Sequence, residues 1–171
     1  RMREATGRAV AECRRLVDEM YGTVRNLALG LRPSMLDDFG LQAALEWHAR
    51  DLMGRYRLDV GLEMDGDFDA LPEKHRTCIY RVVQEATTNC VRHARTKRIE
   101  ISVSAHDGQL QASVSDEGVG LDRTHRRIGL GIRGIEERVK ELQGTVTISR
   151  RPGGGTCLAV RLPVPVSEGS P

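Results

Sequence analysis

The N-terminal part of the chain carries a heptad repeat of apolar side chains. Residues 3–31 contain no proline, and apolar residues recur among them in steps of three and four. The repeat consists of Val10, Cys13, Val17, Met20, Val24, Leu27 and Leu31. Such spacing places one narrow apolar stripe along a helix, and another helix must cover that stripe. The repeat therefore predicts one long helix in a bundle or coiled coil, with a helix that packs on its own domain as the alternative.

The rest of the chain alternates between expected helices and strands. Pro33 ends the first helix, because the residue before a proline is pushed out of the helical region, and residues 33–40 are expected to form a connector. Helices are expected at residues 41–55, 71–93 and 132–143, and strands at residues 58–64, 99–105, 110–115, 146–149 and 157–162. Because most strands are neighbours in sequence, we expect an α+β fold, a two-layer α/β sandwich with a mixed and largely antiparallel sheet.

Charge and cysteine content narrow the class of protein. The 26 basic and 24 acidic residues are interspersed, so a nucleic-acid partner is not expected. No apolar stretch approaches the roughly 18 residues of a membrane helix, so we expect no membrane contact by this segment. The four cysteines form no CxxC pair and no zinc-binding pattern with histidine. We expect them to be reduced, with at least three in the core, in a cytoplasmic protein.

Polar residues on the expected helix 71–93 form the first candidate site. Glu85 and Asn89 are four residues apart, so their side chains project side by side from one face. A carboxylate and an amide oxygen are hard ligands, which suit a Mg²⁺ ion that keeps most of its water. Arg92 lies on the same side, where its guanidinium can meet a phosphate. A solvent-facing polar stripe would give the same spacing, and this alternative stays open.

Glycine-bearing segments supply the other candidate sites. Residues 116–120, with sequence DEGVG, directly follow an expected strand, and Asp116 can accept a hydrogen bond from an exocyclic amine such as that of adenine. Residues 129–134 lead into a helix whose first backbone N–H groups can bind phosphate. Between them, residues 122–128 are polar and basic, as in a mobile lid over an anionic ligand. Taken alone, the pattern of residues 116–120 is more often a plain turn than a binding site.

The order and spacing of these segments resemble the ATP-binding domain of bacterial sensor histidine kinases, within the gyrase/Hsp90/histidine-kinase/MutL superfamily. Residues 80–94 match the N box of that family, residues 116–120 its first glycine box, residues 129–142 its later glycine box with the following helix, and residues 152–156 its final box. Residues 31–45 resemble the linker after the dimerisation helices in one subfamily, the nitrate-sensor and LiaS/DegS-like kinases. The resemblance covers about residues 10–163.

The resemblance implies a Bergerat ATP-binding fold with ATP and Mg²⁺ as ligands. By position, Asn89 would ligate Mg²⁺, and Glu85 would assist through water or act as a base. Asp116 would bind adenine, and Thr156 would line the floor of the adenine pocket. The residues expected to bind the nucleotide are Asn89, Arg92, His93, Asp116, Gly118, Gly120, Gly129, Leu130, Gly131 and Thr156.

The resemblance also implies how the chain is divided. Residues 1–32 would be the second helix of a dimerisation and phosphotransfer bundle, and residues 33–57 the linker and first helix of the catalytic region. Residues 58–163 would form the ATP-binding catalytic domain, and residues 164–171 a flexible tail.

The implied function is transfer of the ATP γ-phosphoryl group to a histidine on an upstream bundle helix that is absent from this chain. A response regulator receiver domain, one with a LuxR-type effector, would accept the group next. The full-length protein would be a homodimer, either free in the cytoplasm or the cytoplasmic part of a membrane-anchored sensor. His106-Asp107 is the one His-acid pair in the sequence, and its place in an expected hairpin turn argues against it as the acceptor.

Two other functions fit parts of the sequence. The first is a related ATPase or an anti-sigma-type serine kinase, against which the heptad repeat and residues 31–45 argue. The second is a non-catalytic, nucleotide-binding dimerisation module with a degenerate pocket. Intact Asn89, Asp116 and the glycines argue against degeneracy.

Overall fold

The structure, a computed structural model, describes residues 34–120 and 130–165. The elements in these residues are α2 (Ser34–Tyr56), β1 (Asp59–Gly66), α3 (Glu73–Asn89), the π-helix η1 (Cys90–Ala94), β2 (Arg98–His106), β3 (Gln109–Asp116), α4 (Leu130–Glu141), β4 (Thr145–Arg150) and β5 (Thr156–Pro163). The expected helix at 3–31 with its heptad repeat, the expected lid at 122–128 and most of the tail lie outside the described residues. The expected division into bundle helix, linker, catalytic domain and tail stays a prediction.

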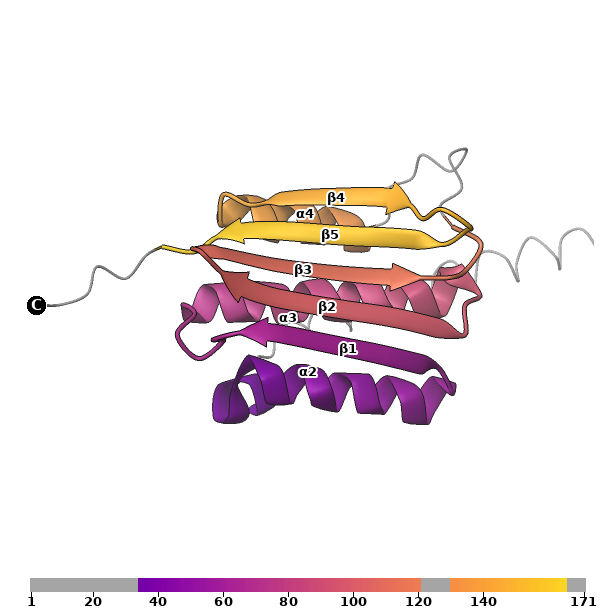
Figure 1. Ribbon diagram of the computed structural model, residues 1–171, viewed down its shortest axis with the longest axis horizontal. Coiled ribbons are helices and arrows are strands. Elements are labelled where there is room, and N and C mark those ends of the chain that lie inside the picture. The colour runs from indigo at the N-terminus through magenta and orange to yellow at the C-terminus, as the bar shows by residue number, and fades with distance from the viewer. Residues whose placement is uncertain (1–33, 121–129, 166–171) are drawn as a thin grey trace, which may run out of the picture. The chain divides into compact units, whose positions relative to one another are not determined.

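The five strands form one mixed sheet in the order β1-β2-β3-β5-β4. Strand β1 runs parallel to β2, and the other three pairs are antiparallel. Helices α2, α3 and α4 all lie on one face of this sheet (Figure 1). The arrangement confirms the predicted α+β fold with a two-layer sandwich and a mixed, largely antiparallel sheet.

Alternating side chains build the core between the sheet and the helices. In β2, Ile99, Ile101 and Val103 are at most 2% exposed, and the residues between them are polar. Strands β3 and β5 continue the pattern with buried Val114 and Leu158, which are paired across the sheet. Because successive strand residues point to opposite faces, the helix-covered face is apolar and the other face is mostly polar.

Helix α3 is the central helix of its layer, between α2 and α4 (Figure 1). Its apolar residues Ile79, Val82 and Val83 are at most 1% exposed. The polar side is buried as well, since Arg81 is 6% and Glu85 7% exposed. The alternative that Glu85 belongs to a solvent-facing polar stripe is therefore wrong. The reason is that a second helix, α4, covers this side of α3, which periodicity within α3 does not reveal.

The expected connector at residues 33–40 is wrong for most of its length, because α2 begins at Ser34. Gly40 interrupts this helix with φ 79° and ψ 179°, so a short helical segment precedes the kink and the main segment follows it. Leu36 in the short segment is 4% exposed and belongs to the core. Burial of this apolar side chain stabilises the segment as a helix against the core. Among the described residues, the other expected elements are confirmed with ends within two residues, except that the helix expected at 71–93 is α-helical only to Asn89 and continues as the π-helix η1.

The described cysteines are all free. Cys78 and Cys90 are buried, whereas Cys157 is half-buried on the open side of β5. Two of the three described cysteines are therefore in the core. Cys13 lies outside the described part, so the expectation of at least three core cysteines stays a prediction. None of the described helices is long and apolar enough to cross a membrane.

A buried hydrogen bond joins α2 to α3. His48 Nε2 lies 2.9 Å from the Thr87 hydroxyl oxygen, and that hydroxyl lies 2.8 Å from the carbonyl oxygen of Val83. The Thr87 hydroxyl donates to the carbonyl, so the imidazole Nε2–H donates to Thr87. Burial lowers the pKa of His48 from its usual value of 6.5, and the Asp51 carboxylate opposes part of this shift.

We expect acid to destabilise the fold through His48. Above about pH 6.5 the imidazole is neutral in both states, and below it the unfolded chain binds a proton that the folded chain excludes. The free energy of unfolding should therefore fall with decreasing pH, by at most about 1.4 kcal/mol per pH unit from this group. Urea unfolding of the wild type and of His48→Gln, from about pH 8 to about pH 5, measures the difference. Parallel pH profiles for the two proteins would refute the expectation.

Candidate functional site

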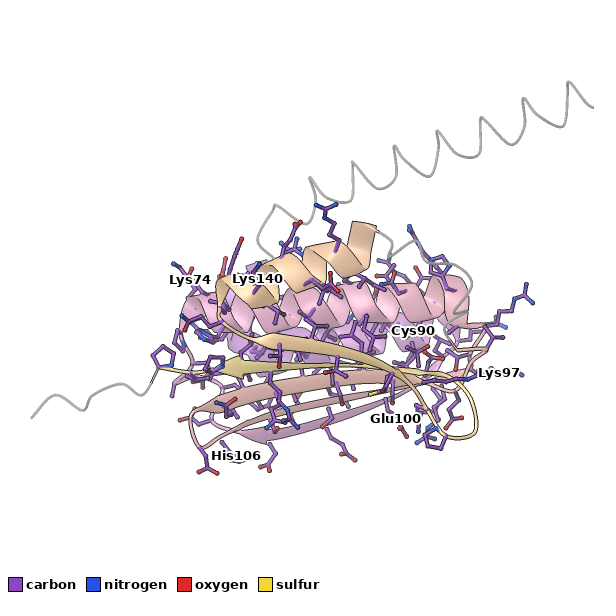
Figure 2. The ribbon with its side chains drawn as sticks, turned by 90° about the horizontal axis from the view of Figure 1, so that it is seen from above. Lys74, Cys90, Lys97, Glu100, His106 and Lys140 are labelled. Carbon is purple, nitrogen blue, oxygen red and sulfur yellow. The ribbon has the colours of Figure 1, made fainter. Side chains whose placement is uncertain are left out.

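The segments singled out in the sequence meet at one end of the domain. This is the end at which β2 begins and β3 ends, because Ile99 pairs with Asp116. Figure 2 shows Cys90 and Lys97 at this end and His106 at the opposite end. The π-helix η1 that follows α3, residues 117–120 after β3, the first turn of α4 and the turn from β4 to β5 therefore lie at the same end of the sheet.

Short contacts join the segments to one another. The N–H of Val119, in the first glycine loop, donates to the carbonyl oxygen of Ala94 at 2.9 Å, which ties this loop to the end of η1. A Cβ atom on Gly120 would lie 3.1 Å from the carbonyl oxygen of Gly155, so the same loop also lies against the turn before β5. The N box, the first glycine box and the final box are thus in direct contact.

Asp116, the last residue of β3, is the most constrained polar residue of the site. Its side chain is on the helix-covered face and the residue is 2% exposed. Oδ1 accepts a hydrogen bond from the N–H of Gly118 at 2.7 Å, and Oδ2 accepts one from the Cys90 thiol at 3.8 Å. Both carboxylate oxygens are therefore oriented, and the group is a preformed acceptor for a further donor.

The Asp116 carboxylate also acts on Cys90. Burial, together with the adjacent carboxylate, raises the pKa of the Cys90 thiol to about 12. The thiol therefore keeps its proton near neutral pH and acts as the donor in its contact with Asp116. This contact was not predicted, because the sequence places Cys90 on the apolar side of its helix and gives no sign that Asp116, 26 residues later, lies against it.

Two glycines allow the backbone around Asp116 to approach this closely. A Cβ atom on Gly118 would overlap the carbonyl group of Ala94. A Cβ atom on Gly155 would overlap the backbone carbonyl of Asp116, and Gly155 also has a φ of +87°, which L-residues with a side chain rarely adopt. Arg151 adds a hydrogen bond to the same Asp116 carbonyl oxygen at 3.3 Å. The end of β3 is thus held by the close contact with Gly155 and by the hydrogen bond from Arg151.

Glu85 and Asn89 occupy the α3 side of the site. The Glu85 carboxylate lies against Gly131 in the first turn of α4, where a Cβ atom would overlap its Oε1 atom. Asn89 is the last residue of α3 and is half-buried, and its side chain makes no hydrogen bond within the described ranges. An exposed polar stripe would not place a carboxylate at a helix junction, so this geometry favours a specific role for Glu85.

The donor atoms available here fit Mg²⁺ rather than a transition metal. A carboxylate and an amide supply hard oxygen ligands, which Mg²⁺ prefers. No group of three or more His, Cys, Asp and Glu side chains that could hold a metal ion occurs in residues 34–120 and 130–165. A Mg²⁺ ion held at Asn89 and Glu85 would therefore keep most of its ligands as water or phosphate oxygen.

The remaining predicted residues lie around this centre or outside it. Arg92 and His93 are exposed in η1. Thr156 begins β5, and because Ser115 pairs with Cys157, the antiparallel register places Thr156 opposite Asp116. Leu130 begins α4, and Gly129 lies outside the described residues. The structure thus places the described residues of this set in one region. Their roles in binding stay predictions.

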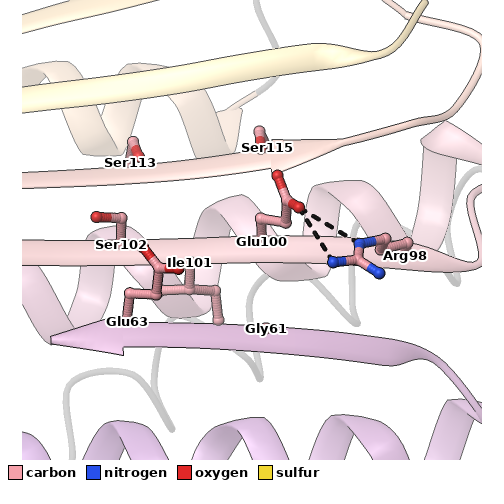
Figure 3. Close-up of a pocket in the computed structure, with 8 residues that line it drawn as sticks. All are labelled: Gly61, Glu63, Arg98, Glu100, Ile101, Ser102, Ser113 and Ser115. Carbon is pink, nitrogen blue, oxygen red and sulfur yellow. Dashed lines mark hydrogen bonds and ion pairs between the residues drawn. The ribbon is translucent and has the colours of Figure 1, made fainter.

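A separate hollow of about 230 Å³ lies on the open face of the sheet (Figure 3). It is lined by Gly61, Glu63, Arg98, Glu100, Ile101, Ser102, Ser113 and Ser115. Arg98 and Arg151 approach Glu100 at 3.3 Å and 3.5 Å. None of the predicted site residues that the structure describes lines this hollow. Asp116 projects to the other face of the sheet.

The chain is similar to a known protein family and to two sensor kinases. Residues 74–166, more than half of the chain, match the family described as histidine kinase-, DNA gyrase B-, and HSP90-like ATPase. The chain is 35% identical over 152 residues to the oxygen sensor histidine kinase NreB of Staphylococcus carnosus, covering 88% of this chain and 43% of that protein. It is 27% identical over 160 residues to the signal transduction histidine-protein kinase/phosphatase DegS of Brevibacillus brevis, covering 93% of this chain and 42% of that protein.

The fold is shared with a solved kinase domain. The histidine kinase domain of the Erythrobacter litoralis EL346 blue-light activated histidine kinase matches with a TM-score of 0.59 and 24% identity, covering 72% of this chain and 58% of that chain. The chain spans less than half the length of each of the two sequence relatives. These matches confirm the resemblance drawn from the glycine boxes and the N box.

Proposed function

Because the chain belongs to the family of histidine kinase-, DNA gyrase B-, and HSP90-like ATPases, we propose that it is the ATP-binding catalytic region of a sensor histidine kinase. The full protein transfers the γ-phosphoryl group of ATP to a histidine and then to the receiver domain of a response regulator. The observation that carries this proposal is the buried Asp116 carboxylate, held on both oxygens where the four segments meet.

Asp116 recognises the base in this proposal. An ionised carboxylate only accepts hydrogen bonds, and the 6-amino group of adenine is a donor. The orientation of the carboxylate is set by Gly118 and Cys90, so it need not be ordered when ATP binds. Thr156, opposite Asp116 across the sheet, lines the same pocket.

Asn89 and Glu85 serve the phosphate end. Bound Mg²⁺ would neutralise charge on the phosphate oxygens, and the Asn89 amide oxygen is the ligand that we assign to it. Glu85, buried against Gly131, orients a water molecule or accepts a proton. Arg92 contacts phosphate from the exposed rim. Since phosphoryl transfer depends mostly on positioning and on charge stabilisation, these contributions suffice for the role of this domain.

The acceptor histidine lies outside the described residues in this proposal, on a bundle helix. His48 and His75 are buried in the domain. His106 lies at the opposite end of β2 from the site, where it pairs with Asp65 at 2.9 Å. At about 3.3 Å per residue along the strand, that end is roughly 25 Å away. We assign a homodimer, a LuxR-type regulator and a cytoplasmic location to the full protein, as the sequence resemblance implies.

Stabilisation by Mg·ATP tests the proposal. With ATP at a hundred times its dissociation constant, the free energy of unfolding should rise by about 2.7 kcal/mol, seen as a higher melting temperature. Asn89→Ala should lose most of this increase, and chelation of Mg²⁺ should have the same effect on the wild type. Ser102→Ala, on the open face of the sheet, is the matched control and should respond like the wild type. An Asn89→Ala protein that is stabilised as much as the wild type would overturn the assignment of Asn89.

A further inference from the structure

We infer that Cys90 is a positioning residue that sets the preference of the site for adenine by fixing the orientation of the Asp116 carboxylate. The inference rests on the proposed function and adds to it. It concerns the choice of base, whereas the proposed function requires only that Mg·ATP binds. Cys90 itself touches Asp116 and is not assigned a contact with the nucleotide.

The geometry gives the carboxylate two donors from two different segments. Cys90 belongs to η1, directly after Asn89, and its thiol lies 3.8 Å from Oδ2. Gly118 belongs to the loop after β3, and its N–H lies 2.7 Å from Oδ1. One donor on each oxygen fixes the rotation of the carboxylate about its side-chain bonds. Removal of the thiol leaves one oxygen held and frees the carboxylate to turn.

The environment keeps the thiol in the donor form. Cys90 is 8% exposed, and Asp116 is 2% exposed, so the contact is shielded from water. An ordinary cysteine thiol is already mostly protonated near neutral pH, so it is available as a donor to the carboxylate oxygen 3.8 Å away. A serine hydroxyl at this position would also donate, whereas alanine and valine side chains would not.

A fixed carboxylate discriminates between bases by their 6-substituents. Adenine presents an amino donor at this position, whereas a purine with hydrogen there offers no such donor. A carboxylate held toward the amino group favours ATP over the 6-unsubstituted purine nucleotide. A carboxylate free to rotate loses part of that preference. Contacts with the triphosphate, which both nucleotides share, are unaffected.

Calorimetric titration with two nucleotides tests the inference on the whole chain. The probes are Mg·ATP and the Mg complex of purine ribonucleoside triphosphate, which is ATP without its 6-amino group. For the wild type we expect at least about tenfold tighter binding of ATP, the effect of one hydrogen bond to a charged group. For Cys90→Ala we expect this ratio to fall severalfold, with affinity for the 6-unsubstituted nucleotide within about twofold of the wild type. Cys90→Ser should retain most of the ratio.

Two further variants separate positioning from packing. Cys78 is a second buried cysteine, on α3 but away from Asp116. Cys78→Ala removes the same side-chain atoms and should leave the ratio of the two nucleotide affinities unchanged. Cys90→Val fills the space without a donor. If Cys90→Ala does not fold, as judged by circular dichroism, Cys90→Val is compared with Cys90→Ser instead. The ratio of the two affinities, ATP over the 6-unsubstituted nucleotide, should then stay high in Cys90→Ser, which keeps a donor, and fall in Cys90→Val, which has none.

Each outcome separates the inference from the proposed function. A wild-type preference for ATP that persists unchanged in both donor-free variants would overturn the role of Cys90 and leave ATP binding in place. Equal wild-type affinity for the two nucleotides would also overturn it, while nucleotide binding stands. A wild-type chain that binds neither nucleotide would refute the proposed function itself.

Discussion

Asp116→Asn is expected to weaken ATP binding by at least about 100-fold, because the substitution places an amide donor where the adenine amino group needs an acceptor. The side chains have nearly the same shape, and the Gly118 N–H can still bond to the remaining oxygen. The domain should therefore stay folded, with an unchanged circular dichroism spectrum. Calorimetric titration with Mg·ATP measures the affinity.

Glu117→Gln is the matched control for this substitution. It also replaces a carboxylate with an amide, in the next residue, but Glu117 is exposed. We expect its affinity for Mg·ATP to stay close to that of the wild type. An Asp116→Asn protein that binds ATP within about threefold of the wild type would mean that the base is not recognised at this carboxylate.

Gly155→Ala is expected to lower the free energy of unfolding by about 3 kcal/mol or more. The added Cβ atom would overlap the backbone carbonyl of Asp116, and the positive φ of +87° adds strain. Movement of the Asp116 backbone should also reduce affinity for ATP. Urea unfolding monitored by circular dichroism measures the stability, and calorimetry measures the affinity.

Gly153→Ala isolates the effect of the overlap. Gly153 has a similar φ of +90°, but a Cβ atom there would meet no atom within 4 Å. This variant should lose only the strain energy, about 1–2 kcal/mol, and should bind ATP like the wild type. Equal losses of stability in the two variants would show that close approach to Asp116 does not determine the need for glycine at position 155.

The strands were predictable because in each of them apolar side chains on one face pack against the core, although in β4 they are only partly buried. Ile99, Ile101 and Val103 alternate with polar residues in the sequence, and the same alternation decides which side of β2 meets the helices. The burial of Glu85 was not predictable in this way, because it depends on α4, which lies far along the chain. The helical segment after Pro33 was not predicted, because a proline can either end a helix or directly precede one, and Pro33 directly precedes the first residue of α2.

The sequence indicated which polar and glycine residues lie together at one end of the domain, but it did not indicate the contacts between them. Asp116 and the glycines follow from the pattern of the boxes, which places polar and glycine residues at element ends. That Cys90 donates to Asp116 depends on how η1 packs against the end of β3, and a spacing of 26 residues carries no such information. The π-helical turn Cys90–Ala94 was also missed, because the sequence was interpreted with the α-helical period throughout.

A crystal structure of the chain with Mg²⁺ and a non-hydrolysable ATP analogue tests the central claim most directly. We predict that the adenine amino group lies within hydrogen-bond distance of the Asp116 carboxylate and that the Asn89 amide oxygen coordinates Mg²⁺. A nucleotide bound in the hollow on the open face of the sheet, or an Asn89 side chain directed away from the phosphates, would contradict the claim.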